Sequence, residues 1–164
     1  MQISFFMNHD SLQALSDNDL FEGLLKAKNS PRLRHPKILH SPGAEFNTVF
    51  NFILYDSYMQ PHMHPSAEKH EDIYLISGKL AILYFDDFGA LVETNVLEDS
   101  KLQYIRVPAF TWHTYVMLTD QVVTYETMNG IYDPTTWKSL ASWAPPEGTL
   151  EAKTYLSNLK AAFI

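Results

Sequence analysis

The chain has 164 residues, of which 46% are hydrophobic and 13% aromatic, enough for one well-cored domain and short of what two domains normally need. Its net charge of -7 and its lack of any block of Lys or Arg argue against nucleic acid or an anionic membrane as a partner. It contains no cysteine, which excludes disulfides and thiolate catalysis and limits any metal site to nitrogen and oxygen ligands.

The start of the chain predicts a soluble protein. MQISFFMNHD lacks the basic start and long apolar core of a secretory signal, and no later segment approaches the roughly 20 apolar residues of a membrane helix. We therefore expect a cytoplasmic protein whose partner is a small-molecule ligand.

Residues 1–43 predict a helical segment followed by a connector. Leucine and phenylalanine recur at helical spacing over residues 10–28, Ser16 or Asp17 can cap the helix, and Pro31 ends it. This indicates one or two short helices. Residues 30–43 contain three prolines and predict an extended connector that crosses the surface of the following domain.

Residues 44–130 predict an antiparallel β-barrel or sandwich. Seven short runs are rich in β-branched and aromatic residues: TVFNFILY, EDIYLIS, KLAILYF, ALVETNVL, LQYIRV, TWHTYVML and QVVTYETM. Ser77-Gly78 and the segment Asp86-Asp87-Phe88-Gly89 are turn signals between runs. No helical pattern is interleaved with the runs, which argues against a parallel α/β sheet.

Residues 131–164 predict a loop and then a helix. The loop NGIYDPTTWKSLASWAPPEG carries three prolines, and helical spacing returns from Leu150 to Phe163. We expect this C-terminal helix to pack against the barrel.

The stretch PHMHPSAEKHEDIYLISG places His62, His64 and Glu71 just ahead of a hydrophobic strand. On an extended strand, residues two apart point the same way and lie about 7 Å apart. Glu71 can join the two histidines from the next strand, and His113 lies in another β-rich run. Three imidazoles and one carboxylate are ligands of a mononuclear metal site, and their pattern favours that reading over isolated surface or core histidines.

The first part of this pattern, His62-x-His64 with Glu71 and then Gly78, resembles the first signature motif of the cupin superfamily. The motif glutamate of cupins commonly falls four or five residues after the second histidine, whereas Glu68 stands at four and Glu71 at seven. We prefer Glu71 because EDIYLISG keeps the six-residue interval to the glycine. Glu68 and the histidine beside Glu71 are the alternative ligands.

The segment from Pro108 to His113 resembles the second cupin motif. Two positions depart from it. Where cupins usually carry a glycine and an asparagine, this chain has Phe110 and Met117. We therefore expect the turn before His113 to differ in shape from that of the family.

The flanking segments SPRLRHPKILH, SYMQPHMHP, LYFDDFGALVE, VPAFTWHTYV and YDPTTWKSLASWAPPEG are similar to the WbuC family of cupin-fold metalloproteins, over most of residues 30–148. The resemblance implies a mainly β protein with a single cupin barrel, an antiparallel double-stranded β-helix or jelly roll, flanked by short N-terminal helices and a C-terminal helix. It also implies one metal bound by His62, His64, Glu71 and His113. Members occur in bacteria, often beside polysaccharide or O-antigen synthesis genes, which implies a sugar-related ligand by context. Cupins are commonly dimers, so a homodimer is implied as well.

Strand parity indicates which neighbours of the candidate ligands face the barrel interior. Tyr58 and Gln60 alternate in phase with the first histidine pair, and Tyr115 is in phase with His113. We expect Tyr58 and Gln60 to contact a substrate. His40 resembles a family position and is a third candidate for substrate binding, with hydrogen bonding inside the connector as the alternative.

Arg106 and Glu126 lie in apolar strands, where an inward charge is costly unless it is paired or used by a ligand. We therefore expect both to point outward into solvent. An isomerase or epimerase would nevertheless need a base with reach over the metal-bound substrate, and Tyr115 and Glu126 are the candidate catalytic residues.

A site of three histidines and one carboxylate leaves one or two coordination positions open and suits one divalent ion of Fe, Zn, Ni or Mn. The leading hypothesis is a metal-binding cupin that acts on or binds a small polar metabolite. Two catalytic variants stay open, a metal-dependent isomerase or epimerase and a non-heme iron dioxygenase. The competing class is a non-catalytic, metal-dependent ligand-binding or sensor domain, so the sequence does not decide whether the protein is an enzyme.

Overall fold

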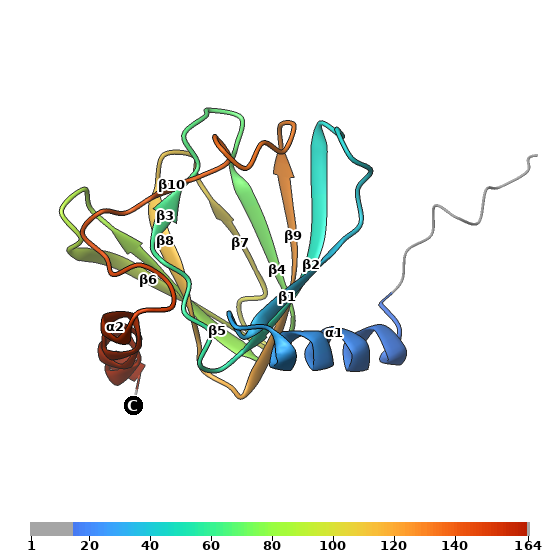
Figure 1. Ribbon diagram of the computed structural model, residues 1–164, viewed down its shortest axis with the longest axis horizontal. Helices are drawn as coiled ribbons and strands as arrows, with labels where there is room; N and C mark the ends of the chain where they lie inside the picture. The colour runs from blue at the N-terminus through green and yellow to red at the C-terminus, as the bar shows by residue number, and fades with distance from the viewer. Residues whose placement is uncertain (1–14, 164) are drawn as a thin grey trace, which may run out of the picture.

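In the computed structural model, which describes residues 15–163, ten strands form two antiparallel five-stranded sheets that face each other (Figure 1). Sheet A has the order β1 (Arg34–Ile38), β2 (Phe46–Leu54), β9 (Gln121–Asn129), β4 (Glu71–Ser77) and β7 (Tyr104–Val107). Sheet B has the order β10 (Ser139–Leu140), β3 (His62–Met63), β8 (Trp112–Met117), β5 (Lys79–Phe85) and β6 (Leu91–Glu98). The predicted antiparallel β architecture is confirmed.

Each of the seven predicted runs forms a strand, namely β2 and β4 to β9. Strands β1 and β10 were not among the predictions, whereas β3 contains His62, which was expected on an extended strand. Strand β1 lies inside the segment expected to be a connector, and it carries Pro36 at the edge of sheet A, where a missing backbone N–H is tolerated. Strands β3 and β10 have two residues each and pair with each other.

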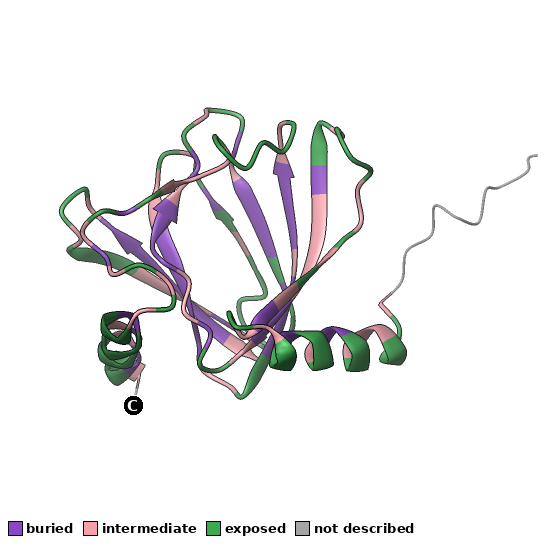
Figure 2. Ribbon diagram, in the orientation of Figure 1, coloured by how far each residue is buried: buried purple, intermediate pink, exposed green. Residues whose placement is uncertain are grey.

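The core lies between the two sheets and is made by inward-facing side chains of β2 and of β4 to β9. Ile73 from sheet A packs there with Ile82, Tyr115 and Met117 from sheet B, and each is at most 2% exposed. Figure 2 shows the buried residues concentrated on the central strands of the two sheets. Side chains pointing inward from these strands therefore enter an environment without bulk water, which strengthens electrostatic interactions.

Both predicted turns are confirmed. At Gly78 the chain leaves β4 of sheet A and enters β5 of sheet B; its φ is +89°, and a Cβ there would lie 2.4 Å from the Gln121 carbonyl oxygen. Only glycine suits that position. The turn between β5 and β6 is held by the carboxylate of Asp86, which accepts the N–H groups of Phe88 and Ala90.

Helix α1 (Asp17–Asn29) covers part of the outer face of sheet A. Ser16 caps it as predicted, forming a reciprocal capping box with Asp19, and Ala27 packs against Phe52 of β2. The helix was predicted from residue 10 on, and residues 10–14 lie outside the described part of the chain.

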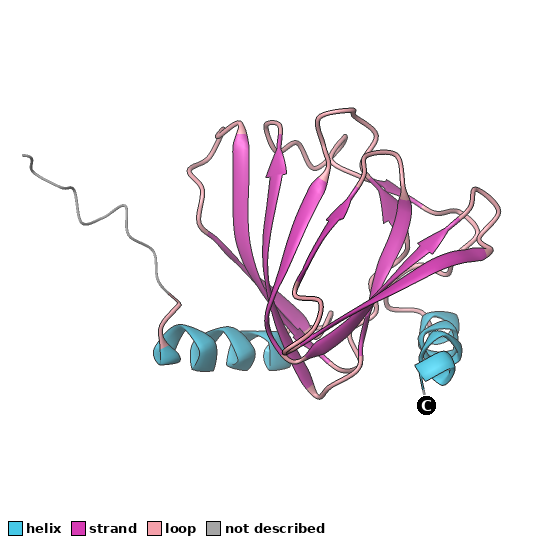
Figure 3. Ribbon diagram, turned by 180° about the vertical axis from the view of Figure 1, so that it is seen from behind, coloured by secondary structure: helices cyan, strands magenta, loops and turns pink. Residues whose placement is uncertain are grey.

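Helix α2 (Leu150–Lys160), continued by a 3-10 turn (Ala161–Phe163), lies on the outer side of sheet B, where Leu156 joins a cluster with Leu83 and Val116 (Figure 3). The predicted packing of this helix on the barrel is confirmed. Within residues 15–163 no helix has the length and hydropathy needed to cross a membrane.

Candidate metal centre

Four side chains meet between the sheets. His62 on β3 is paired in register with His113 on β8, His64 follows β3 directly, and Glu71 opens β4 on the opposite sheet. All four are buried, with exposures of 8% or less. One ligand atom from each lies within 4.8 Å of the others. Residues far apart in sequence thus form one compact cluster of metal-ligand types.

The backbone orients each histidine of this cluster. In every ring Nδ1 lies within 3.1 Å of a backbone carbonyl oxygen. The three contacts are His62 with Gln60, His64 with Trp137 and His113 with Thr111. A carbonyl only accepts, so Nδ1 carries the proton and each Nε2 keeps a lone pair, the arrangement found in metal-bound histidines.

Glu71 completes the cluster. Its Oε2 lies 3.1 Å from Nε2 of His113 and 3.7 Å from Nε2 of His64. Burial alone would raise the pKa of Glu71, but its contacts with His113 and His64 hold that pKa well below its usual value. Burial, followed by the charge of His113, keeps the pKa of His62 well below normal. An ionised carboxylate and a neutral imidazole are the metal-binding forms of these side chains.

The cluster also contains a buried donor atom without a partner. Nε2 of His64 is enclosed and has no hydrogen-bond partner among the described residues, although buried polar atoms are normally satisfied. A divalent ion would supply the missing partner. The residues present therefore fit a metal ion, and they form a possible metal site.

The alternative ligands lie elsewhere. Glu68 is exposed on the loop before β4. His70 is half-buried, with Nε2 4.0 Å from a carboxylate oxygen of Asp72. Of the three adjacent candidates, the structure brings only Glu71 into the cluster.

Tyr115 faces the barrel interior, as predicted. It is 2% exposed, its ring centroid lies 6.1 Å from that of His113, and its hydroxyl has no hydrogen-bond partner within the described chain. Burial, followed by the nearby carboxylates of Glu126 and Glu71, raises its pKa well above normal. The neutral hydroxyl is a donor available to a ligand.

The outward orientation predicted for Glu126 was wrong. Glu126 is 7% exposed and lies on β9 opposite Ile73, on the same face of sheet A as Glu71. Its carboxylate accepts hydrogen bonds from Asn51 at 2.7 Å and Thr124 at 2.6 Å. These two donors make its burial tolerable, while burial and the charge of Glu71 raise its pKa to about 8.

Arg106 points outward, as predicted. Its side chain is 54% exposed and forms a two-pronged ion pair with Asp72, at 2.7 and 2.8 Å. It does not take part in the cluster.

The inward orientation predicted for Tyr58 was wrong. Residues 55–61 do not form a strand, so strand parity does not apply to them. The Tyr58 hydroxyl donates to the Pro145 carbonyl at 2.8 Å, and its ring packs beside Tyr155 of α2. Gln60 is buried but donates its side-chain N–H to the Ala141 carbonyl at 2.9 Å. Both residues hold the C-terminal segment in place.

His40 lies in the loop between β1 and β2. Its Nδ1 lies 3.0 Å from the backbone N of Thr48, which donates to it. This hydrogen bond corresponds to the alternative expectation for His40, and the residue does not belong to the four-residue cluster.

Two residues that the sequence did not single out lie beside the cluster. Trp137 supplies the carbonyl that orients His64, and its ring lies 4.7 Å from the ammonium group of Lys69. Lys138 follows it and precedes β10, whose Ser139 pairs with Met63. Its positive charge contributes to the low pKa of His62, and burial lowers its own pKa. The positive charge of Lys138 is therefore felt at the candidate metal centre.

Phe110 occupies the place where cupins usually carry a glycine. Its φ is +60°, in the left-handed region that glycine favours, and its backbone N–H donates to the His64 carbonyl at 3.0 Å. The sequence change thus leaves a glycine-like backbone conformation in the turn before His113.

Two facing antiparallel sheets with this cluster between them define a cupin-fold protein with a candidate metal site. Solved structures support the fold. Protein SO0799 from Shewanella oneidensis is 12% identical with a TM-score of 0.51, over 65% of this chain and 72% of that one. CapF from Staphylococcus aureus is 18% identical with a TM-score of 0.51, over 65% of this chain and 31% of CapF. Peruvianin-I from Thevetia peruviana, a cysteine peptidase, is 11% identical with a TM-score of 0.50, over 65% of this chain and 66% of that one.

A family model described as a domain of unknown function, DUF6016, matches residues 15–97, just over half of the chain. The chain belongs to this family. A comparison with curated proteins gave no match. Membership of the WbuC family stays a prediction.

Proposed function

We propose that this protein is a metal-dependent cupin that binds or acts on a small polar metabolite. One observation carries the proposal: three buried histidines, each oriented through Nδ1 by a backbone carbonyl, share a cluster with the carboxylate of Glu71. A divalent ion held by these four side chains would supply Lewis-acid chemistry, polarising a ligand oxygen.

The surrounding residues support a ligand with hydrogen-bonding groups and a negative charge. The unpartnered hydroxyl of Tyr115 can donate to a ligand oxygen. The positive charge of Lys138 acts on His62, and such a charge favours an anionic group such as a carboxylate or phosphate. A sugar-related ligand remains part of the proposal on the strength of the WbuC resemblance.

Proton transfer is the catalytic variant that the interior favours. Glu126 lies on the same face of sheet A as Glu71 and points into the barrel, where a carboxyl group with a pKa of about 8 can donate a proton to a bound ligand or, once ionised, accept one. An isomerase or epimerase is therefore the leading enzymatic proposal, with Tyr115 as the second candidate acid or base. An iron dioxygenase and a non-catalytic sensor are the alternatives that metal identity and turnover assays would separate.

Elemental analysis by mass spectrometry, on protein purified without chelators or a metal affinity column, tests the proposal. We expect near-stoichiometric metal in the wild type and its loss in His64→Ala and Glu71→Ala. His70→Ala and Glu68→Ala are matched controls outside the cluster and should keep the metal. A wild type without metal, or equal metal in His64→Ala, would contradict the proposal.

The metal found selects the next assay. Iron would direct work to oxygen consumption, and zinc, nickel or manganese to isomerisation or ligand binding. Cytoplasmic location and a homodimer stay predictions; a solution mass of one chain at working concentration would contradict the dimer.

A further inference from the structure

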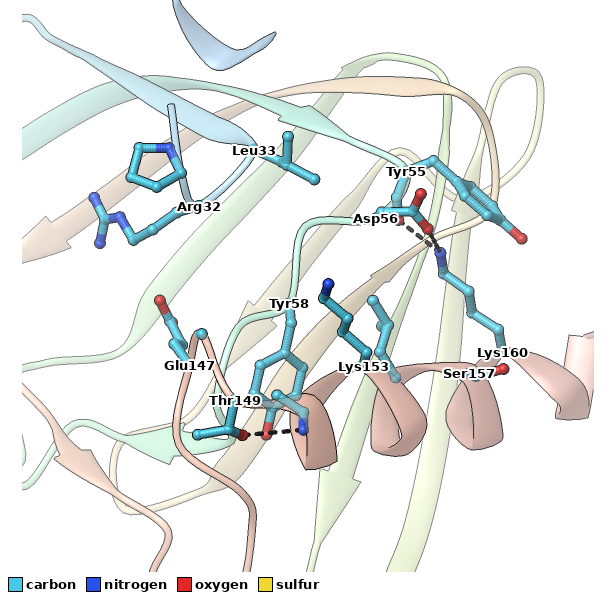
Figure 4. A pocket seen from close by; sticks show the side chains of 14 residues that line it. Arg32, Leu33, Tyr55, Asp56, Tyr58, Glu147, Thr149, Lys153, Ser157 and Lys160 are labelled. Carbon is cyan, nitrogen blue, oxygen red and sulfur yellow. Dashed lines mark hydrogen bonds and ion pairs between the residues drawn. The ribbon is translucent and has the colours of Figure 1, made fainter. Parts of the chain in front are cut away.

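A cavity lies outside the barrel, between helix α2 and the segments 31–33 and 55–58 (Figure 4). We call it the α2 cleft. Its volume is about 850 Å³, within the range of small-molecule sites. None of the four residues of the candidate metal centre lines it, so it is separate from that centre.

One side of the α2 cleft is apolar. Leu33 and Tyr58 line it from the barrel side, and Ala152 and Leu156 line it from α2. Ala152 and Leu156 are 2% and 5% exposed. Leu33 and Tyr58, which are only partly buried, offer most of the surface on which an aromatic or aliphatic body can leave water.

The acidic groups of the α2 cleft are already paired. The carboxylate of Glu147 accepts a hydrogen bond from Arg34 at 2.6 Å. The carboxylate of Asp56 lies 3.2 Å from the ammonium group of Lys160, which also donates to the Tyr55 carbonyl at 2.7 Å. Neither acid therefore leaves a free negative charge for a cationic ligand.

Two basic groups of the α2 cleft are unpaired. Arg32 and Lys153 form no ion pair within 4.0 Å among residues 15–163. Figure 4 shows Lys153 extending from α2 into the cleft, whereas the Arg32 side chain points away from Lys153 on the opposite side. The surplus charge here is positive, although the whole protein carries -7. The amino-terminal end of α2, which also lines the cleft, adds a partial positive charge.

We propose that the α2 cleft binds a small molecule with an aromatic or aliphatic body and one anionic group, such as a carboxylate. The body lies against Leu33, Tyr58 and Leu156, and the anionic group lies at Lys153, near the amino-terminal end of α2. This binding does not depend on a metal in the barrel.

Titration of the full ¹⁵N-labelled chain with 1-naphthoate, followed by NMR, tests the site. We expect saturable shifts confined to the amides of residues 32–33, 55–58 and 147–160. The neutral analogue 1-naphthalenemethanol lacks the anionic group, and acetate lacks the aromatic body. Each should therefore bind with an affinity lower than that of 1-naphthoate by about tenfold or more. Absence of binding, or shifts centred on the cluster residues His62, His64 and His113, would overturn the proposal.

Variants separate the site from general surface binding. Lys153→Glu should weaken naphthoate binding about tenfold or more, while Lys101→Glu, an equal charge change at an exposed lysine between β6 and β7, should leave it unchanged. Ser157→Trp, which fills the cleft from an exposed helical position, should block binding. His64→Ala should bind as the wild type does, even if it loses metal. Equal affinity in Lys153→Glu and the wild type would refute the assignment.

Discussion

Phe110 shows how one residue can hold a strained conformation beside a functional site. Its φ of +60° costs a side-chain-bearing residue roughly 1–2 kcal/mol. Its ring is 57% exposed, so packing returns little of that energy. The turn is nevertheless tied to the candidate metal centre, because the Phe110 N–H donates to the His64 carbonyl. This hydrogen bond therefore helps to keep the backbone of Phe110 in its strained conformation.

Replacing Phe110 by glycine should relieve this strain. We expect Phe110→Gly to raise the free energy of unfolding by about 0.5–1 kcal/mol, after allowance for the greater entropy of glycine in the unfolded chain. Urea denaturation measures the change. Phe88→Gly is the matched control, because Phe88 is 90% exposed but has no positive φ, and it should be neutral or destabilising. A loss of stability in Phe110→Gly would show that the ring makes a larger contribution than its exposure suggests.

The sequence predicted the candidate ligands better than their surroundings. His62, His64 and Glu71 form a local pattern and His113 lies within a second motif, and the resemblance to cupins selected Glu71 over its neighbours. Glu126 was misplaced because its burial depends on Asn51 and Thr124.

One further wrong prediction and one missed residue also depend on features of the fold that the sequence does not display. Tyr58 was misplaced because strand parity was extended into a loop. Lys138 gave no signal, since its position follows from the pairing of β10 with β3, across more than seventy residues of chain.

At the scale of elements, helix α1 approaches sheet A closely because Gly23 faces it. A Cβ at Gly23 would lie 2.4 Å from a ring atom of Phe52, which is fully buried on β2. In an ordinary helix interior, replacing glycine by alanine stabilises by roughly 1 kcal/mol. Here the overlap with an immobile ring outweighs helix propensity.

We therefore expect Gly23→Ala to lower the free energy of unfolding by about 1–3 kcal/mol, measured by urea denaturation. Lys28→Ala, at an exposed position of the same helix, should be nearly neutral. The double variant Gly23→Ala/Phe52→Leu should lose less than the sum of the two single changes, because the smaller side chain makes room for the methyl group. Stabilisation by Gly23→Ala would contradict the close packing.

Elements were predictable from the sequence where the pattern was long enough. The seven strands recognised have four to nine residues with β-branched and aromatic side chains, and Ser16 marked the start of α1. Strand β1 was missed because Pro36 reads as a loop signal, although an edge strand tolerates it. Two-residue strands such as β3 and β10 exist only through tertiary pairing, which no local pattern records.

At the scale of the whole molecule, the candidate metal centre joins the two sheets. Glu71 belongs to sheet A, whereas His62 and His113 belong to sheet B. His64 also connects the centre to the loop after residue 130, because its Nδ1 contacts the carbonyl of Trp137 in that loop. A bound ion would therefore cross-link both layers of the sandwich and its C-terminal segment, and unfolding would have to release it.

Metal removal should accordingly destabilise the whole fold. For a free metal concentration 100-fold above the dissociation constant, the linkage contributes about 2.7 kcal/mol to the free energy of unfolding. Thermal and urea denaturation of wild-type protein should show this loss when a chelator is added, and recovery when the metal is restored. The stabilisation by the metal should also decrease as the pH falls, because protons compete with the ion for the three imidazoles and Glu71. His64→Ala should be insensitive to the chelator, whereas His70→Ala should respond like the wild type, since His70 lies outside the cluster. If the chelator leaves the unfolding midpoint of the metal-loaded wild type unchanged, the bound ion does not cross-link the two sheets.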